Sequence, residues 1–167
     1  MNPIELVPVS EDTSPELLLD VFNSNREFLE MSGEHVPYTA DNVSMYFYEE
    51  TQRENARCFL IRLADSGQVV GTTAMAVPHP PAGCPWIGLM LIDARWQGQG
   101  IGAEASRLID AMLAGEGWTE VQLGVLRANP RAKAFWERQG YHVIGEKEDQ
   151  DKRPVWVMSK SLDRPES

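Results

Sequence analysis

The spacing of apolar residues predicts a strand followed by two helices in the first third of the chain. Residues 4–9 alternate between apolar and polar side chains, as a half-buried strand does. Ser14 and Pro15 are typical of a helix start, because serine caps helical N–H groups and proline fits the first turn. This helix is expected to end at Ser32-Gly33, and a second helix to occupy residues 40–54. The apolar positions that recur near helical spacing in the first helix are Leu18, Val21, Phe22, Phe28 and Leu29.

After residue 55 the pattern becomes strand-like. Residues 58–63 and 69–77 are expected to pair as a hairpin, because Asp65-Ser66-Gly67 between them is a turn signal. Residues 79–85 are rich in proline, which cannot donate to a strand ladder, so they are expected to lie outside any central strand. Residues 86–92 are nearly all apolar, as in a strand that is buried on both faces.

The remaining pattern alternates helices with strands. An apolar helical face spans residues 101–113, and Asn129-Pro130 is expected to open another helix that Gly140 ends. Strands are expected at residues 121–126, 142–146 and 155–159. The order β-α-α-β-β-β-α-β-α-β-β predicts a single α/β domain over residues 1–167, with one mixed, twisted sheet of about seven strands flanked by about four helices.

Composition and cysteine usage narrow the class of protein. A chain of 167 residues with 43% hydrophobic residues fits one domain with a sizeable core. No apolar run approaches the roughly 20 residues of a membrane span, and the N-terminus lacks a signal-peptide pattern. We therefore expect a cytoplasmic protein in which Cys58 and Cys84 are free thiols. Neither cysteine has a second ligand at zinc-site spacing, so no metal is expected.

Charge is unevenly distributed along the chain. The net charge is −10, and residues 1–55 hold twelve acidic side chains against Arg26 and Arg53. Without a basic stripe the chain is not expected to bind nucleic acid. The acidic segment is either a solvated, solubilising surface or a source of a field that attracts a cationic substrate.

Three glycines in five positions are the strongest chemical signal. They lie in Gln97-Gly98-Gln99-Gly100-Ile101-Gly102, between an apolar strand and an amphipathic helix. A glycine turn at a helix start directs main-chain N–H groups at one point and suits a pyrophosphate, although it also suits simple close packing. The spacing differs from the dinucleotide fingerprint, and the Gly-Lys-Ser/Thr of a P-loop does not occur.

Two motifs in this order resemble the GNAT N-acetyltransferase superfamily. Gln97-x-x-Gly100-x-Gly102 matches its first signature, and the run from Asn129 to Tyr141 resembles its second, Asn-x-x-Ala-x-x-Phe-Tyr-x-x-x-Gly-Phe. The resemblance implies acceptor-side helices at about 14–54 and an acyl-CoA-binding core at about 86–146. It also implies cofactor contacts, with Trp136 packing beside the cofactor arm. The residues concerned are Leu91, Ile92, Asp93, Gln97, Gly98, Gln99, Gly100, Ile101, Gly102, Asn129 and Trp136.

The usual acid and base of that family are absent from their usual positions. Trp136 stands where many members have a tyrosine, and an indole N–H cannot serve as a general acid. Trp86 stands where many have a glutamate. The remaining candidates could each have a structural role instead: Asp93 as a solvated strand-end carboxylate, Tyr141 as core, and Asn129 as a helix cap. The candidates for catalysis or substrate contact are Asp93, Glu34, His35 and Tyr141, with His79 in the proline-rich loop; His142 is expected to be structural.

The sequence as a whole indicates an acyl-CoA-dependent N-acyltransferase. Acetyl-CoA is the expected donor, and the acceptor is a small-molecule or peptide amine that attacks the thioester directly in a ternary complex. Two alternatives stay open: a non-catalytic acyl-CoA-binding module, and an O-acyltransferase. The resemblance also implies a homodimer, because dimers are common in that family.

Overall fold

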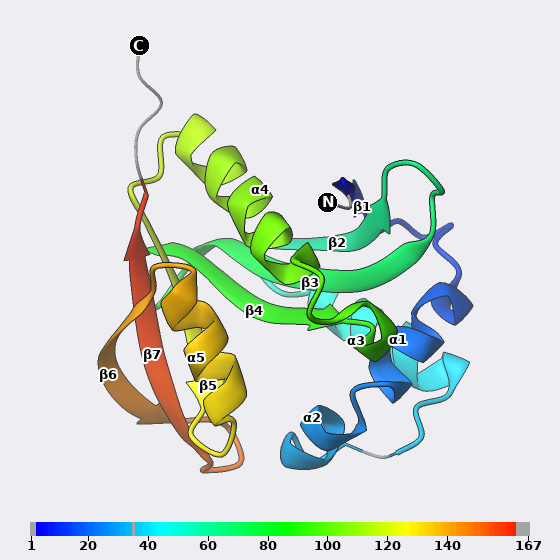
Figure 1. Cartoon of the computed structure of the whole chain (residues 1–167). Helices are drawn as coiled ribbons and strands as arrows, with labels where there is room; N and C mark the ends of the chain where they lie inside the picture. The colour runs from blue at the N-terminus through cyan, green and yellow to red at the C-terminus, as the bar shows by residue number, and fades with distance from the viewer. Residues whose placement is uncertain (1–2, 35, 163–167) are drawn as a thin grey trace.

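The computed structural model describes residues 3–34 and 36–162, which form one seven-stranded mixed sheet flanked by helices (Figure 1). The strand order is β1-β2-β3-β4-β5-β7-β6. Among the strands of the described residues, β4 and β5 are the one parallel pair of neighbours. The predicted fold class is thus confirmed. The strands are β1 (Ile4–Pro8), β2 (Ala56–Leu63), β3 (Val69–His79), β4 (Cys84–Ile92), β5 (Glu120–Leu126), β6 (His142–Glu148) and β7 (Pro154–Ser161).

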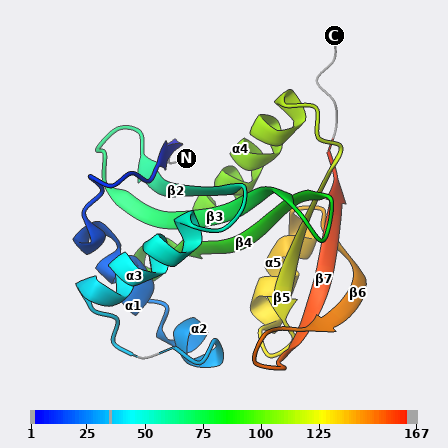
Figure 2. The same cartoon turned by 180° about the vertical axis from the view of Figure 1, so that it is seen from behind.

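Helices cover the two faces of the sheet (Figures 1 and 2). One face carries α4 and α5, whose apolar sides pack on β3, β4, β5 and β7. The other face carries the N-terminal helices, packed on β2 and β4. No helix among the described residues is long and apolar enough to cross a membrane. The helices are η1 (Pro15–Leu18), α1 (Leu19–Asn23), α2 (Arg26–Met31), α3 (Ala40–Thr51), η2 (Ala94–Trp96), α4 (Ile101–Gly115) and α5 (Pro130–Arg138).

The first predicted helix is interrupted near Asn25. Where one continuous helix was expected, η1, α1 and α2 follow one another, and Asn25 leaves the helical region at φ −102°, ψ 45°. Its side-chain amide donates to the carbonyl of Val21 at 2.7 Å and to that of Ile92, at the end of β4, at 2.9 Å. Asparagine competes with helical hydrogen bonding in this way. The break therefore ties the N-terminal helices to the end of β4.

The loop between β3 and β4 is shorter than the proline-rich segment, residues 79–85, that the sequence predicts to lie outside a central strand. β3 continues to His79 and β4 begins at Cys84, so Pro85 lies inside a strand with neighbours on both sides. The expectation that residues 79–85 lie outside a central strand was wrong at this point. The prolines are tolerated because the β3–β4 pairing is irregular between Ala76 and His79, where few ladder bonds are lost.

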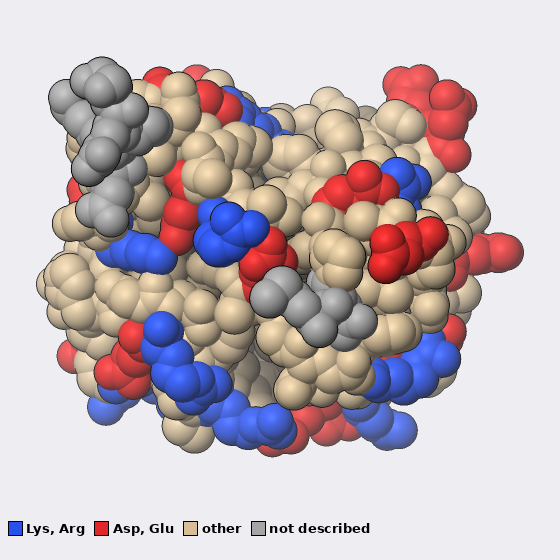
Figure 3. Space-filling model, turned by 45° about the horizontal axis from the view of Figure 1, so that its top comes forward, with Lys and Arg blue, Asp and Glu red and all other residues tan. Residues whose placement is uncertain are grey.

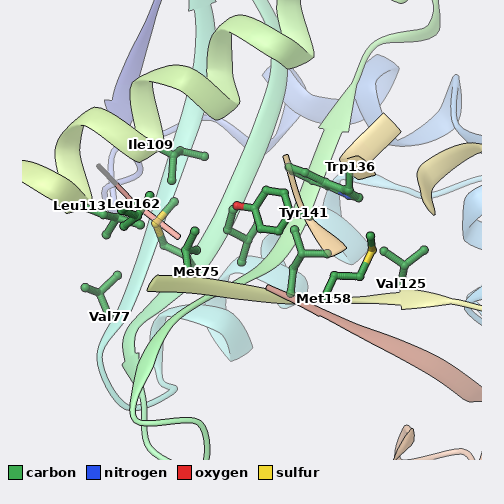
Figure 4. Close-up of a cluster of buried hydrophobic side chains, with 12 residues drawn as sticks. Met75, Val77, Ile109, Leu113, Val125, Trp136, Tyr141, Met158 and Leu162 are labelled. Atoms are coloured by element: carbon green, nitrogen blue, oxygen red, sulfur yellow. The ribbon is translucent and has the colours of Figure 1, made fainter. Parts of the chain in front are cut away.

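The core beneath α4 and α5 contains the second motif (Figure 4). Trp136 of α5 packs edge-to-face on Tyr141 at a centroid distance of 5.3 Å, and Tyr141 is 3% exposed. Ile109 and Leu113 of α4 are fully buried in the same cluster. Tyr141 therefore occupies the core position that its place after Gly140 suggested.

Candidate active site

β4 and β5 pair over two residues only and then part. The parallel pairs are Trp86 with Gln122 and Ile87 with Leu123. The next residue on β4 is Gly88 and the next on β5 is Gly124, so a glycine stands on each strand where pairing stops. Beyond this point the strands lead separately to η2 and α4 and to α5 (Figure 1). The unpaired edges of the two strands therefore face each other over the rest of their length.

Gly88 is the extra residue of a β-bulge. Ala74 of β3 pairs with Leu89, while the next residue, Met75, pairs with Ile87, so Gly88 has no partner on β3. Bulges disrupt the ladder and re-aim the main chain, and they are frequent next to active sites. A lone glycine in an apolar strand was a signal for this feature that sequence reasoning did not use.

Beyond the bulge, alternate residues of β4 direct their main-chain groups away from β3. The N–H of Asp93 donates to the carbonyl of Val70 on β3 at 2.8 Å. Leu91, two residues earlier and opposite Thr72, directs its main-chain groups to β3 in the same way. In an antiparallel pair the intervening residues, Met90 and Ile92, point the other way, toward the parting of the strands. Met90 was not among the expected cofactor contacts. Leu91 and Asp93 were among them, but their main-chain groups are directed to β3.

The side chain of Gln97 has a structural role. Its amide donates to the carbonyl of Ile92 at 2.9 Å and to Oδ1 of Asn25 at 3.0 Å. The same carbonyl accepts from the Asn25 amide, so both of its lone pairs are engaged. Gln97 thereby fixes the glycine loop to the end of β4 and to the α1–α2 junction.

The loop that follows requires glycine at two positions. Gly98 has φ +76° and Gly100 has φ +81°, a left-handed conformation that L-residues with a Cβ rarely adopt. A Cβ at either position would meet nothing within 4 Å, so open space, rather than packing, surrounds them. Gly102 differs, because its Cβ would lie 3.0 Å from the ring of Phe135 in α5. It allows α4 and α5 to approach closely.

α4 begins directly at this loop, with Gly100 as its N-cap. The first helical bond runs from the N–H of Glu104 to the carbonyl of Gly100, at 3.0 Å. The N–H groups of Ile101, Gly102 and Ala103 therefore have no acceptor within the helix and point beyond its positive end. Backbone of this kind, beside glycines that have open space around them, suits a phosphate group.

A groove of about 490 Å³ runs from this helix start along α4 toward the end of α5. Arg107 in its wall pairs with Glu104, and Lys160 of β7 pairs with Asp110. Arg138, at the end of α5, forms no ion pair within the described part of the chain. The groove therefore offers an uncompensated cation to an anionic ligand. Its lining residues are Gln99, Gly100, Ala103, Glu104, Ser106, Arg107, Asp110, Arg138, Gln139 and Lys160.

Asn129 and Trp136 hold α5 beside the parting strands. The Asn129 side chain accepts from the N–H of Ala132 at 3.2 Å, which confirms the helix cap. Trp136 is 8% exposed and packs edge-to-face on Phe135 at 4.9 Å as well as on Tyr141. Both residues thus have packing or capping roles independent of any ligand.

The candidate acids and bases are dispersed. Asp93 is 1% exposed rather than solvated, and its carboxylate accepts three hydrogen bonds from Arg95 at 2.8–3.1 Å. Hydrogen bonding to the Arg95 side chain lowers its pKa, so Asp93 is a poor proton acceptor at neutral pH. Burial raises the pKa of Tyr141, which makes it a poor proton donor.

Glu34, a candidate on the expected acceptor side, follows α2. Burial, and then a hydrogen bond to Glu34, raise the pKa of Tyr38, which places Glu34 beside that hydroxyl. Arg153 of the β6–β7 turn donates to the carbonyl of Met31 at 3.3 Å, so this turn meets the same region. His35 lies outside the described residues. His142 is exposed on β6.

We predict that Trp136 is not a catalytic acid. Trp136→Phe keeps the edge-to-face packing on Tyr141 and should retain most of the activity, whereas Trp136→Tyr should raise activity at high pH. The measurement is kcat/KM against pH for the three proteins. A loss above about 1000-fold in a folded Phe variant would show that the indole N–H supports the chemistry directly.

Comparison with known proteins places the chain in a family. Residues 18–141 match the Acetyltransferase (GNAT) family. The fold is similar to an acetyltransferase from Thermus thermophilus, with a TM-score of 0.79 and 26% identity over 97% of this chain and 100% of that one. It is also similar to spermidine N-acetyltransferase from Vibrio cholerae in complex with CoA and spermine, with a TM-score of 0.70, 17% identity and 95% of both chains covered. No curated protein sequence matches the chain.

A third similar structure is the ribosomal-protein-S18-alanine N-acetyltransferase from Escherichia coli. Its TM-score is 0.68, with 16% identity over 100% of this chain and 97% of that one. The chain belongs to the acetyltransferase (GNAT) family, which confirms the resemblance of the two motifs. It is an acetyltransferase whose co-substrate is acetyl-CoA.

Proposed function

We propose that this enzyme transfers the acyl group of acetyl-CoA to an amine, by direct attack in a ternary complex. One arrangement carries the proposal: the two strands that part at Gly88 and Gly124 lead toward the glycine loop and the start of α4. A ligand with a pyrophosphate at one end and a thioester at the other would follow this path. The space beside Gly88, where a Cβ would meet only a main-chain oxygen of Ala74 at 3.7 Å, leaves room for the reacting group.

The donor would be held mainly by main-chain groups. The N–H groups between Gly98 and Ala103 would bind the pyrophosphate. Those of Met90 and Ile92 would pair with the pantetheine arm as a neighbouring strand does. Arg138, in the groove along α4, would attract the phosphate on the nucleotide end. Trp136 and Asn129 would border the arm from α5.

The reaction needs a neutral amine, a stabilised oxyanion and a leaving thiolate. The donor supplies an activated acyl group. The main-chain N–H of Gly88 would stabilise the oxyanion, because the bulge leaves Gly88 without a partner on β3. A thiolate leaves without strong acid assistance, since a thiol has a pKa of about 8.5. The absence of a tyrosine at Trp136 is therefore compatible with turnover.

An amine panel tests this function. Proteins of similar fold act on spermidine, on the alanine of a ribosomal protein and on nourseothricin. We would incubate the enzyme with acetyl-CoA and spermidine, an alanyl peptide or an aminoglycoside, and measure free thiol together with the product mass. An N-acetyl product supports the proposal. Coenzyme A binding without thiol release would indicate a binding module, and an ester product an O-acyltransferase.

The charge of the N-terminal segment favours a cationic acceptor. The view in Figure 3 shows acidic and basic side chains interspersed, with a group of acidic ones at the upper right. Part of the acidity is compensated, because Asp20 pairs with Arg95 and Glu30 with Arg26. The remaining carboxylates would still attract a polyamine, and this attraction weakens as salt shortens the Debye length below about 10 Å.

We therefore predict a difference in salt dependence between acceptors. From roughly 0.02 to 0.5 M salt, kcat/KM should fall for a cationic amine more than for a neutral one, because only the former is steered. Equal salt dependence would contradict steering. A preference for an anionic acceptor would contradict the proposal of a cationic acceptor. Arg26 or Arg53 would then be the candidate partner of the substrate.

A further inference from the structure

Opposite α4 and α5, no helix of the described residues covers the sheet where β4 and β5 part (Figure 2). Ile87 belongs to the core under α4, so its neighbour Trp86 points to the other face. Figure 2 shows this side, with α1, α2 and α3 on the left, β6 on the right and no helix over β4 and β5 between them. The half-buried Trp86 therefore lies on the face from which an acceptor would approach.

The indole of Trp86 lies at the point where the strands part. A Cβ on Gly124 would be 3.2 Å from Cζ2 of Trp86 and 2.9 Å from a methyl group of Val155. The ring therefore occupies the space that a side chain on Gly124 would need. It borders the position from which an amine would reach a thioester between Gly88 and Gly124.

His79 is fixed against this indole. Its main-chain carbonyl accepts from the N–H groups of Ala82 and Gly83, at 3.1 and 2.8 Å, which closes the β3–β4 turn. Its ring stacks on Trp86 with a centroid distance of 5.1 Å and an interplanar angle of 28°. Across residues 3–34 and 36–162 its Nδ1 has no hydrogen-bond partner although it is buried. The imidazole is held by stacking and is not committed to a structural hydrogen bond.

The groups around His79 favour its neutral form. Nζ of Lys147, on β6, lies 4.4 Å from the centroid of the Trp86 ring. Cys84 pairs with His79 across the β3–β4 ladder, and Arg53 follows α3. Burial, then Lys147, then Arg53 lower the pKa of His79 from 6.5. A base must be unprotonated to accept a proton, and a group with a lowered pKa meets that condition at pH 7.

We propose that His79 is the general base that deprotonates the acceptor amine. The assignment rests on the proposed N-acyl transfer. The ammonium form of the acceptor gives one proton to Nε2 of the imidazole, since Nδ1 is buried, and the freed lone pair attacks the thioester carbonyl carbon. A C–N bond forms and the C–S bond breaks, so the electron pair leaves on sulfur. The second nitrogen proton passes through solvent to the thiolate. Neither Asp93, held by Arg95, nor Glu34, beside Tyr38, lies at this stacked pair.

The test compares His79→Phe, which keeps the stacking and removes the nitrogens, with wild type and with His79→Gln as a second variant. The donor is acetyl-CoA, and the acceptor is the panel amine that wild type acetylates fastest. We expect kcat/KM of His79→Phe to be about 100-fold lower at pH 7, in the range for a general base. The deficit should shrink toward the amine's own pKa of about 10.4, where the amine deprotonates without help. In a third variant, His79→Gly, imidazole added to the buffer should restore part of the activity.

The KM for acetyl-CoA separates this inference from the function itself. A folded His79→Phe with unchanged KM for acetyl-CoA and a deficit that depends on pH supports the base assignment. A deficit in kcat/KM that is equal at all pH values would overturn the base assignment and leave His79 as packing for Trp86. Wild-type activity in folded His79→Phe and His79→Gln would do the same. Wild type that binds coenzyme A but acetylates no amine would instead refute the proposed transfer.

Discussion

Coenzyme A binding should weaken at least tenfold in Gly100→Asp, a loss of about 1.4 kcal/mol in binding free energy. Gly100 has φ +81° and caps α4 directly at the N–H groups assigned to the pyrophosphate. An aspartate there would place a negative charge before those groups and repel the phosphates. Since a Cβ meets nothing within 4 Å, the variant should fold. Isothermal titration calorimetry with coenzyme A measures the effect.

Gly67→Asp is the matched control. Gly67 has φ +76° and equally open surroundings, but it lies in the β2–β3 turn. Both variants should lose a similar amount of unfolding free energy, roughly 1–2 kcal/mol, for a side chain in the left-handed region. Only Gly100→Asp should lose affinity. Unchanged affinity in folded Gly100→Asp, or an equal loss in the control, would refute the phosphate site at this loop.

The free energy of unfolding should fall by about 2–3 kcal/mol in Gly71→Ala, the upper part of the range for overpacking a core. The added Cβ would lie 2.5 Å from the main-chain oxygen of Leu91 and 3.0 Å from the side chain of Ile92. Backbone cannot yield as a flexible side chain does, so β3 and β4 must separate. Urea denaturation at equilibrium measures the loss.

Gly145→Ala provides the comparison for this effect. It is also a strand glycine without a positive φ, but a Cβ there meets nothing within 4 Å. We expect its unfolding free energy to stay within about 0.5 kcal/mol of wild type, as for most surface substitutions. If the two variants were equally stable, the close approach of β3 to β4 at Gly71 would be wrong.

The periodic segments and the two motifs could be predicted because they depend on local chemistry. The apolar run to Ile92, the glycine loop and the amphipathic α4 were predicted close to their observed bounds. The left-handed conformations at Gly98 and Gly100 explain why glycine recurs there. The cytoplasmic location and the homodimer stay predictions.

The features that were missed depend on contacts between distant residues. The helix break at Asn25 follows from its bond to Ile92, 67 positions away. The bulge at Gly88 is defined by its register against β3, and the burial of Asp93 by the fold around it. Likewise, His79 and Trp86 become neighbours only when the β3–β4 turn closes. The pattern of residues in a single sequence does not show which distant residues will be neighbours in the fold.

A crystal structure with bound acetyl-CoA would test the central claim most directly. The account predicts the pyrophosphate within hydrogen-bond distance of the N–H groups from Gly98 to Ala103, the pantetheine arm along Met90 and Ile92, and the thioester between Gly88 and Gly124. A cofactor bound on the face that carries Trp86, or one that leaves the glycine loop empty, would contradict it.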